Sequence, residues 1–223
     1  VAHEINNPLT GVINFAQLVL DGLPSTAERE KAFCAEIIGE GKRIAGIVRN
    51  LLAFSGQDRP GSDKNSLEEM LAQILALTDQ LFRREGIAIE TEIAPGLPPV
   101  RCTAQQIEHV IFNLLANART ATMDAAPGNG GGRRIRIELG PYREDGREYV
   151  RLAVRDYGPG IAEENQSRIF EPFFTTGDQS HGSGTGLGLS SSYGIVSEHQ
   201  GRLWFETWPG AGTVFHLALP VAG

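Results

Sequence analysis

The chain has 223 residues, of which 41% are hydrophobic and 21% charged, and its formal net charge at pH 7 is −7. These values are ordinary for globular domains with a real core. The acidic balance argues against binding to nucleic acid, which requires a basic face, but leaves open a nucleotide whose charge is met by a metal ion. No apolar run approaches the ~20 residues that cross a bilayer, so we expect no membrane contact in this fragment. Cys34 and Cys102 lack metal-ligand spacing, and we expect buried thiols in a reducing, cytoplasmic compartment.

The first 54 residues have the pattern of two packed helices. Apolar residues recur at alternating steps of four and three, which is typical of coiled coils and four-helix bundles. The two seams consist of Ile5, Leu9, Val12, Ala16 and Val19, and of Cys34, Ile37, Gly41, Ile44, Val48 and Leu51. Because seams this narrow make little core alone, we expect a homodimer in which two hairpins form a four-helix bundle. The pattern is already under way at Val1, so we expect the first helix to begin before this chain.

The remaining sequence predicts a second domain of mixed structure. Residues 55–63 are polar and rich in turn formers, which indicates a linker. Beyond it the periodicity predicts helices at 67–84, 104–124 and 187–199, and strands at 87–93, 134–139, 149–156, 203–207 and 213–219. Helices on one face of a mixed sheet make an α/β sandwich, so the fold class is α+β: a hairpin at 1–54 and a sandwich at 64–223.

The segment from His3 to Thr10 has the chemistry of a nucleophile. On a helix, Asn7 lies one turn from His3, and Pro8 should bend the helix beside it. A neutral imidazole nitrogen can attack phosphorus while the adjacent Glu4 takes up a proton. Alone, the segment fits a surface histidine beside a kinking proline equally well.

Two further groups of residues suit a nucleotide. Asn113 and Asn117 share a helix face, and an amide oxygen suits Mg²⁺, although exposed polar residues look the same. Asp156 ends a strand before Gly158 and Gly160, where a carboxylate can accept the amino group of adenine and the missing side chains let the base approach. In isolation this segment equally fits a plain turn.

Four alternate glycines in Gly182–Ser190 lead into a helix, where loop amides can face phosphate oxygens. This loop is neither a Walker loop nor a dinucleotide fingerprint. We expect Phe170, Phe173 and Phe174 to anchor it by packing.

In this order and spacing, the motifs resemble those of the sensor histidine kinases of bacterial two-component systems over almost the whole chain. The matching segments are the phosphoacceptor box His3–Thr10, asparagine box Asn113–Ala118, first glycine box Asp156–Ile161, phenylalanine box Phe170–Thr176 and second glycine box Gly182–Ser190.

The resemblance implies a sandwich of the gyrase and histidine-kinase type, in which MgATP phosphorylates His3 and an aspartate of a response regulator then receives the phosphoryl group. Glu4 is implied as proton acceptor, Asn7 as the residue that positions a water for dephosphorylating the regulator, and Asn117 as the Mg²⁺ ligand. The implied ATP-binding residues are Asn113, Asn117, Asp156, Gly158, Gly160, Ile161, Thr176, Gly184, Thr185, Gly186, Leu187, Gly188 and Thr213.

The chain departs from the family pattern in the loop and beside Asp156. Residues 171–188 contain no Lys or Arg, and Gly177 stands where family members often have lysine. We therefore expect loose ATP binding that weakens as Mg²⁺ is lowered, with Arg119 as a candidate cation for the phosphates. Tyr157 stands where asparagine is common in the family, and the sequence gives no reason for it.

Two other functions compete with the kinase. A nucleotide-binding scaffold or phosphatase-biased module has the neutral loop in its favour, and an intact His3, Glu4 and Asn117 against it. An ATPase of the gyrase or mismatch-repair type shares the fold but is disfavoured by the hairpin and the acidic charge. We expect the other histidines to be structural or at the surface: His109, His181, His199 and His216.

Overall fold

The structure is a computed structural model that describes residues 2–24, 26–39, 41, 64–125, 133–175 and 186–223, with only the backbone described at 2–10 and 13. It divides into two compact units, 1–57 with 173–187 and 58–172 with 188–223. The predicted linker at 55–63 lies outside the described residues.

The first unit contains the predicted helical hairpin. Helix α1 (Ala2–Gly22) is followed by a helical stretch at 28–39. Ala16, Cys34 and Ile38 are buried, as two helices packed along a narrow seam require. Of the predicted seam residues, Ala16 and Cys34 are buried within the single chain, whereas Val12, Val19 and Ile37 are exposed; Ile38 was not predicted and is buried with an exposed fraction of 7%. The seam residues after Gly41 lie outside the described residues.

The hairpin exposes many large apolar side chains. Among the described residues of this unit they are Val12, Phe15, Leu18, Val19, Phe33 and Ile37. An uncovered apolar face of this kind is typical of an interaction surface.

The second unit contains a five-stranded mixed sheet in the order β2-β4-β5-β7-β6. The strands are β2 (Ala88–Ile93), β4 (Arg134–Glu144), β5 (Arg147–Asp156), β6 (Arg202–Trp208) and β7 (Gly212–Pro220). Strand β2 runs parallel to β4 and the other neighbours are antiparallel. The short strands β1 (Lys64–Asn65) and β3 (Val100–Arg101) pair separately and were not predicted.

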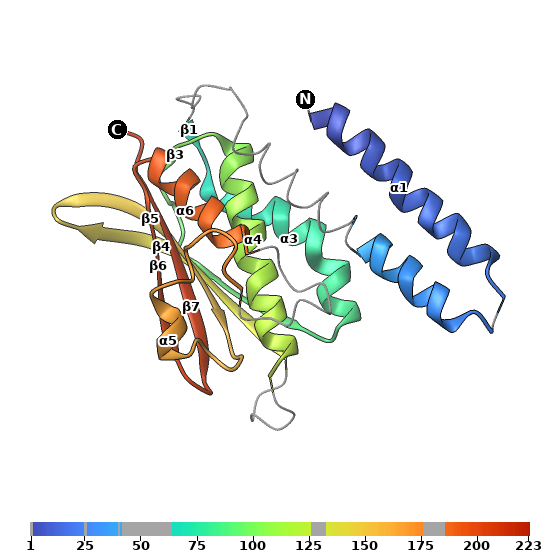
Figure 1. The fold of residues 1–223 in the computed structure, drawn as a ribbon. Helices are drawn as coiled ribbons and strands as arrows, with labels where there is room; N and C mark the ends of the chain where they lie inside the picture. The colour runs from blue at the N-terminus through green and yellow to red at the C-terminus, as the bar shows by residue number, and fades with distance from the viewer. Residues whose placement is uncertain (1, 25, 40, 42–63, 126–132, 176–185) are drawn as a thin grey trace. The chain divides into compact units, whose positions relative to one another are not determined.

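Helices α3 (Leu67–Arg84), α4 (Ala104–Met123) and α6 (Gly188–Glu198) lie on one face of this sheet, which confirms the predicted sandwich (Figure 1). Helix α3 begins where Ser66 Oγ accepts the N–H of Glu69, 3.3 Å away. A further short helix, α5 (Glu163–Gln166), follows the end of β5.

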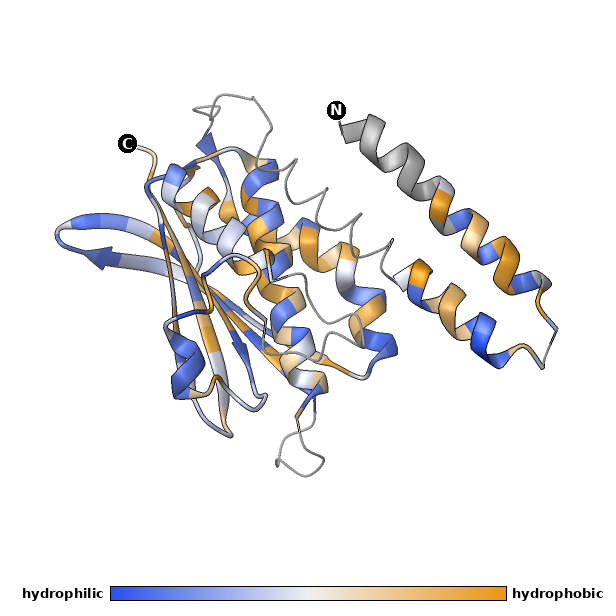
Figure 2. Cartoon of the chain, viewed as in Figure 1, coloured by the Kyte–Doolittle hydropathy of each residue, from blue (hydrophilic) through white to orange (hydrophobic). Residues whose placement is uncertain are grey.

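The core forms between α4 and the central strands. Leu114 and Leu115 of α4 and Ile135 and Ile137 of β4 are fully buried. Hydrophobic residues accordingly run along α4 and the central strands, whereas the end of the β4–β5 hairpin is hydrophilic (Figure 2). This layer holds in place the strand ends and the helix face that carry the predicted site.

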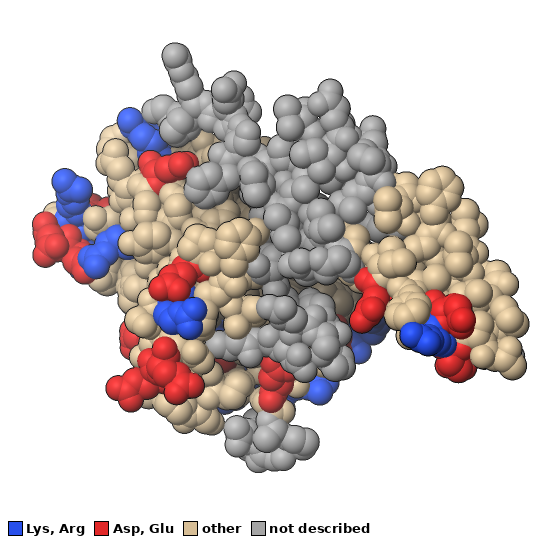
Figure 3. Space-filling view, in the orientation of Figure 1, with Lys and Arg blue, Asp and Glu red and all other residues tan. Residues whose placement is uncertain are grey.

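The surface of the described part carries both signs of charge. Acidic and basic side chains are interspersed on the face shown in Figure 3, with no broad basic area. No described helix is both long enough and apolar enough to span a membrane.

His199 joins two helices of the sandwich. Its Nε2 accepts the backbone N–H of Thr103 at 3.0 Å, so Nδ1 carries the proton and donates to the carbonyl of Ile195 at 2.8 Å. His199 is thus a structural histidine that ties the end of α6 to the start of α4, as predicted.

Candidate functional site

Asp156 is a buried carboxylate at the end of β5, with an exposed fraction of 2%. Its Oδ1 accepts the backbone N–H groups of Gly158 at 2.9 Å and Thr213 at 3.2 Å. Burial raises the pKa of this carboxyl, and the two backbone N–H groups oppose that rise. A buried acid of this kind is costly to the fold and is characteristic of a functional position.

The two glycines after Asp156 let the following loop lie flat against protein backbone. A Cβ at Gly158 would lie 2.5 Å from the carbonyl oxygen of Ala121 on α4. A Cβ at Gly160, whose φ is +74°, would lie 2.5 Å from the carbonyl oxygen of Trp208. These contacts give a packing reason for both glycines in addition to the predicted approach of a base.

Thr207, which was not predicted as a site residue, connects two of the predicted residues. Its Oγ1 accepts the backbone N–H of Ile161 at 2.9 Å and lies 3.0 Å from Oγ1 of Thr213. Thr207 and Thr213 face each other in the register of β6 and β7. Two threonines on neighbouring predicted strands were the available signal.

The two predicted asparagines are used differently. Nδ2 of Asn113 lies 3.3 Å from both the carbonyl of Gly188 and Oγ of Ser192, and so joins α4 to the start of α6. Nδ2 of Asn117, one turn later, is buried with no hydrogen-bond partner in the described part of the chain. A buried amide without a partner is rare in native proteins, which marks Asn117 as a candidate ligand-binding residue.

The phenylalanine segment was only partly predicted. Phe170 packs against Tyr193 and Phe205, with ring centroids 5.2 and 6.0 Å apart, as expected. Phe173 is 67% exposed, so its predicted packing role is wrong. Its backbone N–H donates instead to the carbonyl of Gly186 at 2.9 Å, and both residues have a φ of +67°. Thr176, Gly184 and Thr185 lie outside the described residues.

The phosphoacceptor segment is helical in backbone. Helix α1 includes His3, Glu4 and Asn7 and continues through Pro8, so the proline does not end the helix. The side chains of these residues lie outside the described part of the chain.

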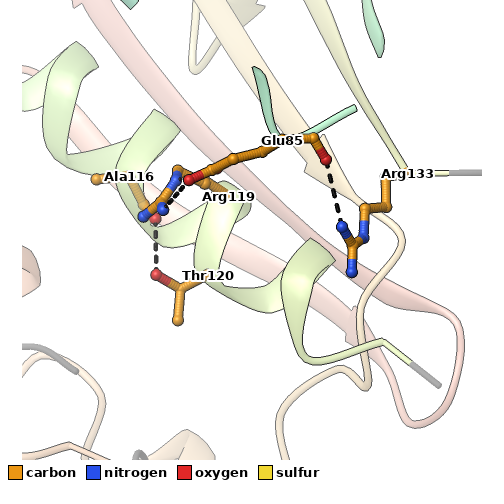
Figure 4. A network of polar contacts seen from close by, with 5 residues as sticks. All are labelled: Glu85, Ala116, Arg119, Thr120 and Arg133. Carbon is orange, nitrogen blue, oxygen red and sulfur yellow. Dashed lines mark hydrogen bonds and ion pairs between the residues drawn. The ribbon is translucent and has the colours of Figure 1, made fainter. Parts of the chain in front are cut away.

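The contacts of Arg119 do not fit its predicted role as a cation for the phosphates. It donates through Nε to Oε2 of Glu85 at 2.6 Å and through Nη2 to Oε1 (Figure 4). Arg133 Nη1 donates to the backbone carbonyl of Glu85 at 3.3 Å, so the network joins α3, α4 and the start of β4. The guanidinium is committed to a structural ion pair.

Known proteins resemble the chain over its whole length. The Vibrio alginolyticus sensory histidine kinase/phosphatase NtrB is 33% identical over 99% of this chain and 61% of its own length. Full-length ShkA in complex with AMPPNP superposes with a TM-score of 0.69 at 25% identity, over 99% of this chain and 44% of ShkA. ThkA, in its complex with the response regulator TrrA, superposes with a TM-score of 0.66 at 29% identity, over 99% of this chain and 60% of the ThkA chain. The chain therefore spans less than two thirds of these relatives.

Two family profiles match. Residues 1–60 match the His Kinase A (phospho-acceptor) domain, and residues 102–223 match the histidine kinase-, DNA gyrase B- and HSP90-like ATPases. Because the second profile also covers the gyrase-type ATPases, it is the phospho-acceptor match that separates the chain from that alternative. The chain belongs to the histidine kinase family and holds its catalytic core, a phosphoacceptor domain followed by an ATP-binding domain.

Proposed function

We propose that this chain autophosphorylates His3 from MgATP and passes the phosphoryl group to an aspartate of a response regulator. The observation that carries the proposal is Asp156, a buried carboxylate fixed by two backbone amides in the ATPase-type domain of a chain that also carries a phosphoacceptor domain.

The purine site of the proposal is built around Asp156. Both backbone donors fall on Oδ1, so Oδ2 is the oxygen assigned to the amino group of adenine. The glycines of the 156–161 loop and Thr213 frame the base, and Thr207 holds Ile161 and Thr213 together. The residues are oriented before ligand arrives, which lowers the entropic cost of binding.

The asparagine helix suits a magnesium nucleotide. No cluster of three His, Cys, Asp or Glu suited to a metal occurs among the described residues, so a metal here would take most of its ligands from phosphate and water. The buried, unpartnered Nδ2 of Asn117 is a donor that suits a phosphate oxygen, and its Oδ1 is the atom assigned to the metal, which would supply charge neutralisation at the phosphates. Gly186, Leu187 and Gly188, together with Thr176, Gly184 and Thr185, are assigned to the triphosphate, and Asn113 to fixing Gly188.

His3 is the proposed acceptor. One imidazole nitrogen attacks the γ-phosphorus; the N–P bond forms as the bond to the bridging oxygen breaks, and ADP leaves. The proton on the other nitrogen goes to Glu4. Attack by a receiver aspartate then forms an acyl phosphate and regenerates His3. Asn7 is assigned to positioning a water that hydrolyses the regulator's acyl phosphate, which is the opposing phosphatase function.

Two partners belong to the proposal. The exposed apolar side chains of the hairpin fit a second copy of the chain, which gives a dimeric four-helix bundle. The relative ThkA is crystallised with a response regulator, and NtrB is named a kinase and a phosphatase, which supports a receiver domain as the second partner. Residues 1–54 and 64–223 are the proposed domains. Free Cys34 and Cys102 fit a cytoplasmic, reducing site for the reaction.

The deciding experiment is incubation with γ-³²P-labelled MgATP. We expect acid-labile, alkali-stable label in the parent chain and none in His3→Gln, with unchanged ATP binding in both. Binding without any label in the parent chain would favour a nucleotide-binding scaffold. Label that survives His3→Gln would place the acceptor elsewhere.

A further inference from the structure

The face of the sheet opposite α3, α4 and α6 carries a row of arginine and aromatic side chains beside Asp156. Arg155 precedes Asp156 on β5, and because strand side chains alternate, it lies on the opposite face from Asp156. Arg134 of β4 and Trp208 of β6 lie on this same face by strand register, close to the same end of the sheet. Tyr157 continues the alternation one residue after β5 ends.

These four residues form one continuous stack. The guanidinium carbon of Arg134 lies 4.1 Å from the ring centroid of Tyr157, and that of Arg155 lies 5.0 Å from the same centroid. Arg155 also lies 5.5 Å from the ring centroid of Trp208. These are cation–π distances, and a planar guanidinium can stack on rings where an ammonium cannot. We call Arg134, Tyr157, Arg155 and Trp208 the Tyr157 stack.

The rings are close contacts of both arginines of the stack. Nε of Arg134 and Nε of Arg155 are both buried without a hydrogen-bond partner among the described residues. Nη1 of Arg134 forms a long ion pair with Oε1 of Glu90, at 3.8 Å. The rings therefore help to fix these two guanidinium groups, at a site where their Nε atoms have no hydrogen-bond partner among the described residues.

The stack touches both protein segments that frame Asp156. Tyr157 begins the loop that continues through Gly158 and Gly160. Trp208 is the last residue of β6 and leads into the β6–β7 turn, and its carbonyl is the group against which Gly160 packs. The N–H of Gly210 in that turn donates to the carbonyl of Pro159 at 2.7 Å. Arg155 thus links the loop to the turn from the far face of the sheet, across β7.

We propose that the Tyr157 stack positions the Asp156 loop for purine binding, so that Tyr157, Arg155 and Trp208 are positioning residues for the nucleotide. The inference rests on the proposed function, because it takes the Asp156 loop to be the adenine site. It also gives Tyr157 a role at a position where related chains commonly have asparagine. The ring acts through Arg155, and the ligand meets the opposite face of the loop.

The test compares dissociation constants for ADP, measured by titration calorimetry on the full chain. Tyr157→Leu keeps an apolar side chain and removes the π face, and should raise the Kd about tenfold. Tyr157→Phe keeps the π face and should stay within about twofold of the parent. The autophosphorylation rate at saturating ATP should be unchanged in both, because the stack positions the purine and takes no part in the transfer.

Tyr142→Leu is the matched control. Tyr142 lies on the same face, also faces an arginine (Arg151, 5.5 Å) and is near the opposite end of β4, away from Asp156. Its replacement should lower Tm without changing the Kd for ADP. Equal rises in Kd for Tyr142→Leu and Tyr157→Leu would overturn the proposal, because general loosening of the sheet would then explain both.

Trp208→Leu and the double variant with Tyr157→Leu provide a second readout. Because both rings act through Arg155, the double variant should bind ADP about as weakly as either single variant. Independent contributions would instead add up to a roughly hundredfold rise in the Kd for ADP. Additive losses would overturn the proposal. If Tyr157→Leu does not fold, Arg155→Lys replaces it, because a point-like ammonium cannot stack on two rings.

Asp156→Asn separates this proposal from the proposed function. If Asp156→Asn binds ADP normally, the adenine site itself is wrong. If Asp156→Asn loses binding while Tyr157→Leu and Tyr157→Phe bind like the parent, only the stack proposal fails.

Discussion

The backbone N–H of Phe173 donates to the carbonyl of Gly186 across the twelve residues between them, and both residues have a left-handed φ of +67°. The contact is so close that a Cβ at Gly186 would lie 2.4 Å from the carbonyl carbon of Phe173. Backbone strain at a non-glycine residue persists only where the surrounding structure enforces it, and it concentrates at functional segments. The pair closes the base of the segment that the sequence assigns to the triphosphate.

We predict that Gly186→Ala weakens ATP binding at least tenfold, which is about 1.4 kcal/mol. The added methyl group cannot fit against Phe173 and must open the base of the loop. Calorimetry with MgATP measures the loss, and circular dichroism checks that the sheet domain remains folded.

The control for this variant is Gly96→Ala. Gly96 has a similar φ of +69°, but an added Cβ there would meet nothing within 4 Å. This variant therefore loses only the about 1–2 kcal/mol of stability that a side chain in the left-handed conformation costs. Parent-like ATP binding by Gly186→Ala would contradict the assignment of this segment to the nucleotide.

Asp156→Asn should separate binding from folding. Its Oδ1 can still accept both backbone N–H groups, so we expect the variant to fold. The loss of a charge-assisted hydrogen bond, about 1.5–3 kcal/mol, should weaken ADP binding roughly 10- to 100-fold. Calorimetry together with a thermal melt measures both quantities.

The same residue predicts a pH dependence. Because burial raises the pKa of Asp156, its carboxylate is protonated at a higher pH than an ordinary aspartate. ADP affinity should therefore fall on acidification, beginning above the ordinary value of 3.8, and Asp156→Asn should lack this component. An identical pH profile in parent and variant would contradict it.

The local parts of the fold were predictable from sequence. Helix α3 was predicted at the bounds observed, because an N-cap at Ser66 and acidic residues in the first turn mark its start. Strand β4 runs five residues beyond the predicted end at Leu139. It continues there into a hairpin whose charged and polar residues break the apolar alternation. The Asp145-Gly146 turn, with φ of 48° and 78°, was the available signal.

The relations across the sheet were not predictable. Asp156 and its glycines could be found because strand end and turn are adjacent in sequence. Thr207 and Trp208 reach the same loop only because β6 pairs with β7 and β7 with β5. The Glu85–Arg119 pair likewise depends on how α3 packs on α4, so the sequence offered Arg119 as a free cation. Patterns along the chain indicate local structure, whereas the order of the strands in the sheet becomes visible only in the folded structure.

The magnesium dependence of ATP binding tests Asn117 and the loop that lacks Lys and Arg. In the parent chain, removing Mg²⁺ should raise the Kd for ATP by more than about tenfold, or 1.4 kcal/mol. Asn117→Ala should bind ATP weakly at all Mg²⁺ concentrations, because the amide assigned to the metal is gone. Gln105→Ala, on an exposed part of α4, is the control. A Kd in the parent that does not respond to Mg²⁺ would refute the expectation.

Arg119→Gln should affect stability and leave nucleotide binding unchanged. The hydrogen bond from Arg119 lowers the pKa of Glu85, so the pair stabilises the fold above the ordinary value of 4.5 and loses its effect as pH falls below it. The pair is partly exposed, so we expect a loss of about 1 kcal/mol in the free energy of unfolding. Urea denaturation and a cycle with Glu85→Gln measure it. A tenfold rise in the Kd for ATP would restore Arg119 as a phosphate ligand.

His109 predicts a loss of stability in mild acid. Burial on α4 lowers the pKa of His109 below the ordinary 6.5. The pKa of His216 is also lowered, mainly by burial and to a smaller extent by the positive charge of Arg151. Below about pH 6.5 these histidines bind protons in the unfolded chain more readily than in the folded chain. Each of them therefore lowers the free energy of unfolding by up to about 1.4 kcal/mol per pH unit. Urea denaturation at pH 7.5 and 5.5 should show this decrease, and His109→Gln should reduce it. If the variant loses as much stability as the parent over this interval, His109 is not the group responsible, because a glutamine in its place has no proton to gain.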